Sequence, residues 1–460
     1  LHLLSRRQRQ MCIRDRDRNF YRTLFHLMII VVFQNIIAYS INMADNLMLG
    51  MYSQSSLSGA ATVNQIQFLL QQMTLAIGDT LVIIASQYWG QKKTKPIRTF
   101  TGIALATGLI LGLTVFILTT LFPREILMLF TKKESYIIQG MDYLSLIRFT
   151  YPLFVLSTIL MAAFRSVETV SIALKISILS LIVDVSINYT LIFGKFGFPE
   201  MGTKGAAVGT LVARILELVI VVIYLIFADH KLKLFCKDFL HFTKEAFSRF
   251  FEILWPSFLS NTLWALATPI QTGILGRLSA DAIAANSVST TMFQYLKVIT
   301  IGEASASAVL IGTTIGENRG TTKVKEYSKT LQVIYLIIGS VLGISLFFLR
   351  IPLLSLYDLT QNAYQMADQI LIILSIVMVG MSYQMPTGIG IIKGGGDVKY
   401  MMYLNLISTW AIVMPLSFLG AFVWKLPVPM VVLLLNSDQL FKCIPTYLYV
   451  KKDKWIKVLV

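Results

Sequence analysis

The chain is 460 residues long, 55% of its residues are hydrophobic, only 14% are charged, and its formal net charge is +16 at pH 7. A soluble domain carries about a quarter of its residues as charged side chains, so this composition excludes an ordinary soluble protein and favours one embedded in lipid. The basic excess would suggest nucleic acid in a soluble protein, but in a membrane protein it is expected in loops facing anionic lipid. We therefore expect a lipid bilayer, and no nucleic acid, as partner.

The opening segment 1–18 differs from the rest of the chain. It begins with Leu1 rather than Met, holds six arginines and has no apolar run long enough for a signal peptide. We expect a tail that is either foreign to the fold or disordered, and we exclude it from the fold.

Cysteines and histidines predict neither a disulfide framework nor a metal site. Cys12, Cys236 and Cys443 are far apart and odd in number, and the four histidines match no ligand motif such as HExxH. No nucleophile–base motif indicates an enzyme. We expect a protein without catalytic activity, metal or cofactor.

Long apolar segments predict an all-α polytopic membrane protein with twelve transmembrane helices, because each span needs about 20 apolar residues. Boundaries follow from where the apolar runs end. The expected spans are 24–49, 60–88, 99–122, 140–161, 171–194, 205–228, 250–275, 282–312, 329–349, 366–388, 400–422 and 428–449.

Loop charge alternates along the chain and predicts its sidedness. Segments 91–98 and 316–329 each hold four basic residues and 229–249 holds five, whereas 51–59 holds none and 276–281 holds one. The positive-inside rule places both termini and segment 229–249 in the cytoplasm. We expect the membrane to be a plasma membrane of bacterial type. An even number of spans satisfies this arrangement.

The polar segment 229–249 divides the hydrophobic body into two similar halves. Landmarks recur with offsets of 224 to 228 positions: Gly50 with Gly276, Asp79 with Glu303, Gly90 with Gly316, and Arg165 with Lys393. Parallel repeats of six spans predict two pseudo-symmetric six-helix lobes with a binding region between them. The expected N-lobe is 19–228, the cytoplasmic linker is 229–249, the C-lobe is 250–450 and the cytoplasmic tail is 451–460.

Polar residues at membrane depth point to a site in the N-lobe. An ionisable side chain there costs about 2.5–3.5 kcal/mol on insertion scales, so each requires a partner or a role. Gln34, Asn42 and Asp45 share one face of the first span. Asp184 and Asn188 are one turn apart on the fifth, where their oxygens suit Na⁺ or a proton. The alternatives are a solvated Asp45 near the headgroups and a packing hydrogen bond at Asp184.

Residues of the second half are candidates for the substrate cavity. Lys297 and Glu303 are six residues apart and point in different directions, so each faces a cavity or another helix. An ion pair across helices is the alternative. Trp264 and Tyr295 offer aromatic faces that suit a cationic ligand, although such residues are more often packing groups.

A set of motifs resembles the multidrug and toxic-compound extrusion (MATE) family, from about Phe20 to Val460. No single motif is specific, but the set is. The motifs are DNLMLG at 45–50, SQYWGQKK at 86–93, NYTLIFGKFGFPEMGTKGAA at 188–207, ARILE at 213–217, WPSFLSNTLW at 255–264, IKGGGD at 392–397 and KKDKWIK at 451–457.

The resemblance implies two lobes, a cleft that opens alternately to each side, and drug export coupled to inward flow of H⁺ or Na⁺. It implies that Asp45, Asp184 and Asn188 form a cation-coupling site in the N-lobe. Two positions depart from the family pattern. Asp184 stands at a position where the most similar branch of the family usually has Asn. The coupling ion could therefore be either H⁺ or Na⁺. Thr262 stands where relatives carry a glutamate, which weakens a C-lobe cation site and leaves Glu303 as a substitute.

We therefore expect a monomeric secondary antiporter that exports amphipathic, often cationic, drugs or toxic metabolites. The alternative is a lipid-linked oligosaccharide flippase of the same superfamily, for which extra spans or a strongly basic central cavity are expected. The cavity should be lined by the first, second, seventh and eighth spans. Its candidate residues are Gln34, Asn42, Trp264, Tyr295, Lys297 and Glu303.

Overall fold

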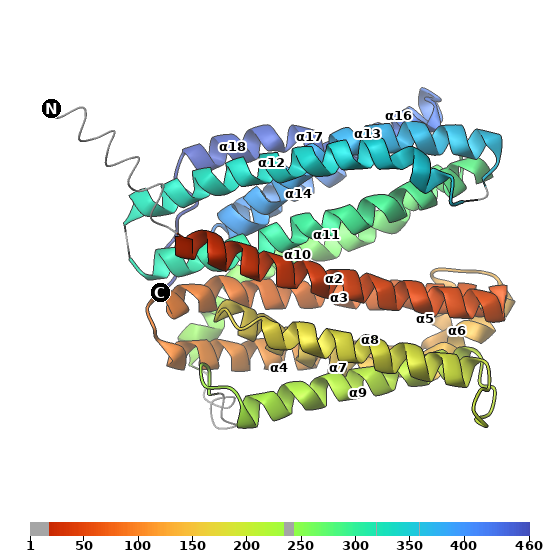
Figure 1. Ribbon diagram of the computed structural model, residues 1–460, viewed down its shortest axis with the longest axis horizontal. Coiled ribbons are helices and arrows are strands. Elements are labelled where there is room, and N and C mark those ends of the chain that lie inside the picture. The colour runs from red at the N-terminus through yellow and green to blue at the C-terminus, as the bar shows by residue number, and fades with distance from the viewer. Residues whose placement is uncertain (1–17, 234–242, 319, 358) are drawn as a thin grey trace.

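The computed structural model describes residues 18–233, 243–318, 320–357 and 359–460, and almost all of them lie in helices that run along the long axis of the molecule (Figure 1). The expected tail 1–18 falls outside these residues except for Arg18, where the first described helix begins. Part of the expected linker 229–249 also falls outside them.

The first half of the chain forms one lobe. Its helices are α2 (Arg18–Tyr52), α3 (Gln54–Gly90), α4 (Thr94–Leu121), α5 (Pro123–Met128), α6 (Glu134–Ile147), α7 (Thr150–Ser166), α8 (Ser171–Ile192) and α9 (Thr203–Phe227). Helices α6 and α7 meet at a bend of 55° and together make one span. Six spans therefore build this lobe.

The second half forms the other lobe, with several interrupted helices. They are α10 (Lys244–Gly276), α11 (Ala280–Gly316), α12 (Thr321–Leu354), α13 (Gln361–Pro386), η2 (Thr387–Lys393), α14 (Val398–Leu406), η3 (Ile407–Val413), α15 (Met414–Phe418), η4 (Leu419–Val423), α16 (Val428–Leu435), α17 (Asp438–Phe441) and α18 (Cys443–Lys451). The π-helix η2 begins directly after Pro386. Proline has no backbone N–H to donate, so the regular α-helical hydrogen bonding is interrupted at this point and a wider turn can follow.

Twelve spans account for the described chain. Nine of its helices are long and apolar enough to cross a membrane, or ten when the bent pair α6–α7 counts as one span. Helix α10 and the broken segment α16–α18 complete the expected twelve, six in each lobe. The predicted fold class, an all-helical polytopic protein with two six-helix lobes, is confirmed.

The loop expected at 51–59 is much shorter than predicted. Helix α2 continues to Tyr52 and α3 begins at Gln54, so only Ser53 separates them. Ser53 is the N-cap of α3, and its hydroxyl accepts a hydrogen bond from the Ser55 amide at 3.2 Å. Because α3 begins at this cap, its first turns contain polar residues that precede the apolar run. Hydropathy alone does not predict such an extension.

Two buried cores belong mainly to single lobes, and a third joins them. The joint core lies near the end of the molecule where α2 begins and the chain ends, here called the terminal end (Figure 1). It unites Leu24 and Leu27 of α2 with Val309 of α11, Tyr335 of α12 and Ile391 of η2. The lobes are thus packed together at the terminal end.

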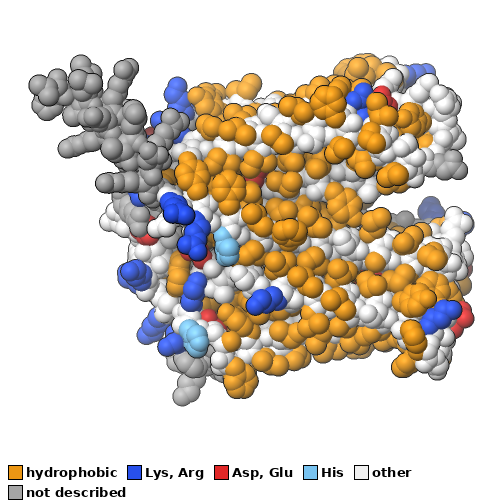
Figure 2. Space-filling view, viewed as in Figure 1, with side chains coloured by type: hydrophobic (Ala, Val, Ile, Leu, Met, Phe, Trp, Pro, Cys, Tyr) orange, Lys and Arg blue, Asp and Glu red, His pale blue; other side chains and the backbone are white. Residues whose placement is uncertain are grey.

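At the opposite end the lobes part. Figure 2 shows a cleft between them that opens away from the terminal end, and hydrophobic side chains cover the flanks of both lobes. Lysines and arginines gather at the terminal end (Figure 2). A lipid-facing girdle with charged ends is the surface expected of a protein that crosses a bilayer.

Candidate functional site

Helices α2 and α8 meet at a carboxylate–amide–carboxylate cluster inside the N-lobe. The Asn188 Nδ2 donates to Asp45 Oδ1 at 2.7 Å and to Asp184 Oδ2 at 3.1 Å. Asp184 and Asn188 come from α8, and Asp45 comes from α2. The structure brings together the three side chains that the sequence identified as a cation-coupling site.

Two members of this cluster are buried, Asp45 is half-buried, and two oxygen atoms of the buried pair have no partner among the described residues. Asp184 is 1% exposed and Asn188 is 0% exposed. Asp184 Oδ1 and Asn188 Oδ1 are buried and accept no hydrogen bond from any described residue. Two carboxylates that share one amide donor repel each other in a low-dielectric interior, and unpaired oxygens add to the cost. A proton or a Na⁺ ion, for which carboxylate and amide oxygens are suitable ligands, would relieve both effects.

Gly209 on α9 fixes the position of the bridging amide, a role that sequence analysis missed. A Cβ at this position would lie 1.9 Å from Asn188 Oδ1, so only glycine permits α9 to approach this closely. The buried hydroxyl of its neighbour Thr210 makes no hydrogen bond with the part of the chain that the structure describes. Without a structure, the GTLVAR sequence resembles ordinary helix packing.

A partly buried ion pair lies in the same lobe as the cluster. Arg214 Nη1 lies 2.6 Å from Glu217 Oε2, and the Arg214 guanidinium lies 5.0 Å from the centre of the Phe154 ring. The positive charge of Arg214 also acts on Asp45 and Asp184. One guanidinium cannot neutralise three ionised carboxylates, so the cluster keeps an excess of negative charge.

Removing this cation should destabilise the fold. We expect Arg214→Met to lower the free energy of unfolding by about 2 kcal/mol, less than for a fully buried pair because 28% of the Arg214 side chain is exposed. Lys204→Met, which breaks the exposed pair with Asp142, should change it by less than about 1 kcal/mol. Denaturant titration in mixed micelles measures both. Equal losses in the two variants would contradict the prediction.

The other polar residues of the first span do not join the cluster. Asn42 is exposed, and its amide donates to the Ala38 carbonyl of the same helix at 3.1 Å. Gln34 is half-buried on the same helix. Of the predicted polar face of α2, only Asp45 contacts α8 through a side-chain hydrogen bond.

The aromatic candidates gather where α10 and α11 approach the N-lobe. Lys297 Nζ lies 5.5 Å from the centre of the Trp264 ring, which is also 6.0 Å from the ring of Phe68 on α3. The Tyr295 hydroxyl donates to Met43 Sδ of α2 at 3.2 Å. These contacts place Trp264, Tyr295 and Lys297 between the lobes, as candidates for a substrate cavity.

Glu303 lies apart from this aromatic group. It is 1% exposed, and neither of its carboxylate oxygens accepts a hydrogen bond from any described residue. The preceding Gly302 packs against the backbone of Met28 on α2, so Glu303 lies at the interface of the lobes. Its counterpart in the first half, Asp79, instead lies 3.4 Å from Arg165, which also donates to Ser305 of α11 at 2.8 Å.

The fold agrees with the family comparison. The family model MatE matches residues 31–190 and 256–419, more than half of the chain, so the chain belongs to the MatE family. It is a multi-pass membrane protein of a family of transporters.

Curated relatives are distant in sequence but match most of the chain. The "Uncharacterized transporter YisQ" of Bacillus subtilis is 23% identical over 387 residues, 82% of each chain. A "Probable multidrug resistance protein NorM" of Thermotoga maritima is 22% identical over 430 residues, 92% of this chain and 90% of its own.

Solved structures of similar fold cover nearly the whole chain. One is the outward-facing conformation of a multidrug resistance MATE family transporter, with a TM-score of 0.86, 16% identity and coverage of 95% and 96% of the two chains. Another is a transporter of the same superfamily from Pyrococcus furiosus, described as having a binding pocket of reverse polarity, with a TM-score of 0.85, 16% identity and the same coverage.

Proposed function

We propose that this protein is a secondary antiporter that exports amphipathic, often cationic, small molecules in exchange for H⁺ or Na⁺ by alternating access. The observation that carries the proposal is the Asn188 bridge between the half-buried Asp45 and the buried Asp184, a cluster suited to one small cation. Relatives named as multidrug resistance proteins support the export of small molecules.

The basic terminal end faces the cytoplasm in this proposal. The cleft of Figure 2 then opens to the outside, and the joint core closes the cytoplasmic side. Coupling requires that the cation and the exported compound favour different conformations, and the strength of coupling is limited by that difference in affinity. Entry of a cation into the cluster is the step that would favour one conformation.

Dye efflux from inverted membrane vesicles tests the proposal. Vesicles are loaded with ions so that a pH gradient or a Na⁺ gradient is imposed separately. We expect one of the two gradients to drive transport and the other to have little effect. If neither gradient drives transport, the antiport proposal is wrong.

The charges at the lobe interface do not favour the alternative function, a lipid-linked oligosaccharide flippase. Such a flippase would be expected to have a strongly basic cavity. Arg165, a basic residue at the lobe interface, is paired with a carboxylate, because its Nη2 lies 3.4 Å from Asp79 Oδ1.

Trp264 should contribute to the recognition of cationic compounds, because its ring already faces the Lys297 ammonium. We expect Trp264→Leu to raise the Kd of a cationic dye about 2- to 5-fold, with little change for a neutral dye of similar size. Fluorescence titration in detergent measures both values. Trp255→Leu, on the same helix but 62% exposed, is the matched control and should change neither. Equal weakening of both dyes by Trp264→Leu would indicate lost packing instead.

A further inference from the structure

The chain that follows α18 returns to the C-lobe as an extended segment, residues 455–459, here called the strap. Trp455 is fully buried, and its indole Nε1 donates to the Val450 carbonyl at 3.0 Å. The Lys457 amide donates to the Gly395 carbonyl at 2.8 Å, and the Lys457 ammonium lies 2.9 Å from Asp397 Oδ1. The strap is therefore fixed to the C-lobe along most of its length.

The far end of the strap crosses to the N-lobe. Gln87 of α3 is 0% exposed, its Nε2 donates to the Lys457 carbonyl at 3.1 Å, and its Oε1 accepts from the Leu459 amide at 2.8 Å. The Leu459 side chain packs against the N-lobe core. One side chain of the N-lobe thus pairs with the backbone of the strap in both directions.

Gln87 lies at the line where the lobes touch. A Cβ at Gly316 of α11 would lie 1.9 Å from the Gln87 carbonyl oxygen, so the backbones of α3 and α11 are in direct contact. Alternating access requires the lobes to separate at this end. Because the strap is bound to the C-lobe, that separation must break both of its hydrogen bonds with Gln87.

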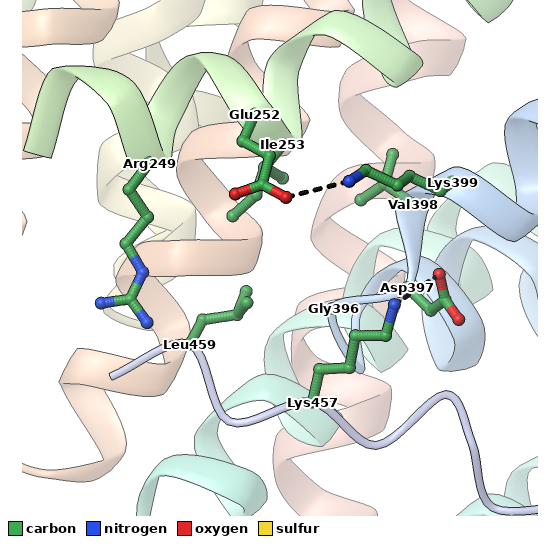
Figure 3. Close-up of a pocket in the computed structure, with 9 residues that line it drawn as sticks. All are labelled: Arg249, Glu252, Ile253, Gly396, Asp397, Val398, Lys399, Lys457 and Leu459. Atoms are coloured by element: carbon green, nitrogen blue, oxygen red, sulfur yellow. Dashed lines mark hydrogen bonds and ion pairs between the residues drawn. The ribbon is translucent and has the colours of Figure 1, made fainter. Parts of the chain in front are cut away.

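A pocket of about 190 Å³ borders the strap on its other side (Figure 3). Lys457 and Leu459 of the strap and Arg249 and Glu252 of α10 line it, and the Lys457 side chain points to Asp397 (Figure 3). The strap therefore faces space on this side rather than packed protein. When the strap leaves Gln87, the contact that it gives up with the N-lobe core is that of the partly buried Leu459 side chain.

We propose that the strap is a closure device for the terminal end: its two hydrogen bonds with Gln87 stabilise the conformation in which the lobes are packed together there. This inference rests on the proposed function only in requiring two conformations of the lobes. The strap would shift the equilibrium between these two conformations of the lobes, although it contacts neither the cation cluster nor the substrate cavity.

Distance measurements between spin labels test this proposal. Labels are attached through Lys95→Cys in the N-lobe and Lys329→Cys in the C-lobe, both exposed near the terminal end, in a chain whose native cysteines are replaced. Gln87→Leu removes both hydrogen bonds and replaces the polar amide with an apolar side chain of similar size. We expect the ratio of open to closed distances to rise about tenfold or more, because each lost bond contributes modestly and both are lost.

Two further chains make the result decisive. A chain that ends at Ile456 lacks the same two bonds but keeps Trp455, and it should show the same shift. Gln384→Leu removes a buried glutamine whose Nε2 bonds to Gln439 Oε1 at 2.6 Å within the C-lobe, so it should show none. Unchanged distances in the first two chains, or an equal shift in all three, would overturn the proposal. No ion gradient is involved, so failure of antiport in vesicles leaves this test intact.

Discussion

Asp184→Asn is expected to reduce ion-driven efflux about 100-fold or more while leaving the protein folded. The substitution is nearly isosteric, but it removes the buried charge that a proton or Na⁺ would neutralise. Dye binding in detergent should persist, because the aromatic group around Trp264 lies on other helices. Initial rates of efflux under the driving gradient, compared with equilibrium dye binding, measure the two effects separately.

Asp142→Asn is the matched control, because Asp142 is an aspartate of the same lobe that is half-exposed and paired with Lys204 at 3.2 Å. It should transport at the normal rate. Asp45→Asn should behave as Asp184→Asn does, since both carboxylates receive the same amide. Full efflux by Asp184→Asn under both gradients would show that Asp184 is a packing group and would leave Glu303 as the remaining candidate.

Gly209→Ala should abolish driven efflux nearly as completely, although the substitution adds only a methyl group. That methyl would lie 1.9 Å from Asn188 Oδ1, so the amide must rotate or α9 must move. Either movement breaks the geometry that holds Asp45 and Asp184 together. Overpacking of this kind costs about 1–3 kcal/mol, so we expect reduced stability as well as lost transport.

Gly273→Ala supplies the comparison for this prediction, because a Cβ at Gly273 of α10 meets nothing within 4 Å. It should retain efflux and stability. Thermal unfolding in detergent and vesicle efflux are measured on both variants. Normal efflux by Gly209→Ala would mean that the exact position of the Asn188 amide is unimportant for coupling.

Hydropathy predicted the number and order of the spans but not their ends. Helix α2 exceeds the predicted span 24–49 at both ends, because a transmembrane helix continues into the polar zones wherever capping allows it. Helix α10 is not among the helices that are long and apolar enough to span a membrane by composition alone, yet the apolar run at 250–275 predicted it.

The sequence predicted the polar residues of the site but not the residue that positions them. Asp184 and Asn188 are one helical turn apart, so the sequence alone places them together. Asp45 joins them only through contact between distant helices, and its family position supplied that link. Gly209 left no recognisable signal, because a glycine that permits close approach resembles any other glycine in an apolar helix. The cross-lobe pairing of Gln87 with the tail follows only from tertiary structure.

The joint core has a consequence for the order of synthesis. Leu24 and Leu27 leave the ribosome well before α11, α12 and η2, yet part of their packing surface comes from these later helices. Until those helices insert, this face of α2 has only lipid to cover it. The N-lobe is therefore incomplete as a folding intermediate, and its first helix reaches its native packing only after most of the chain has been translated.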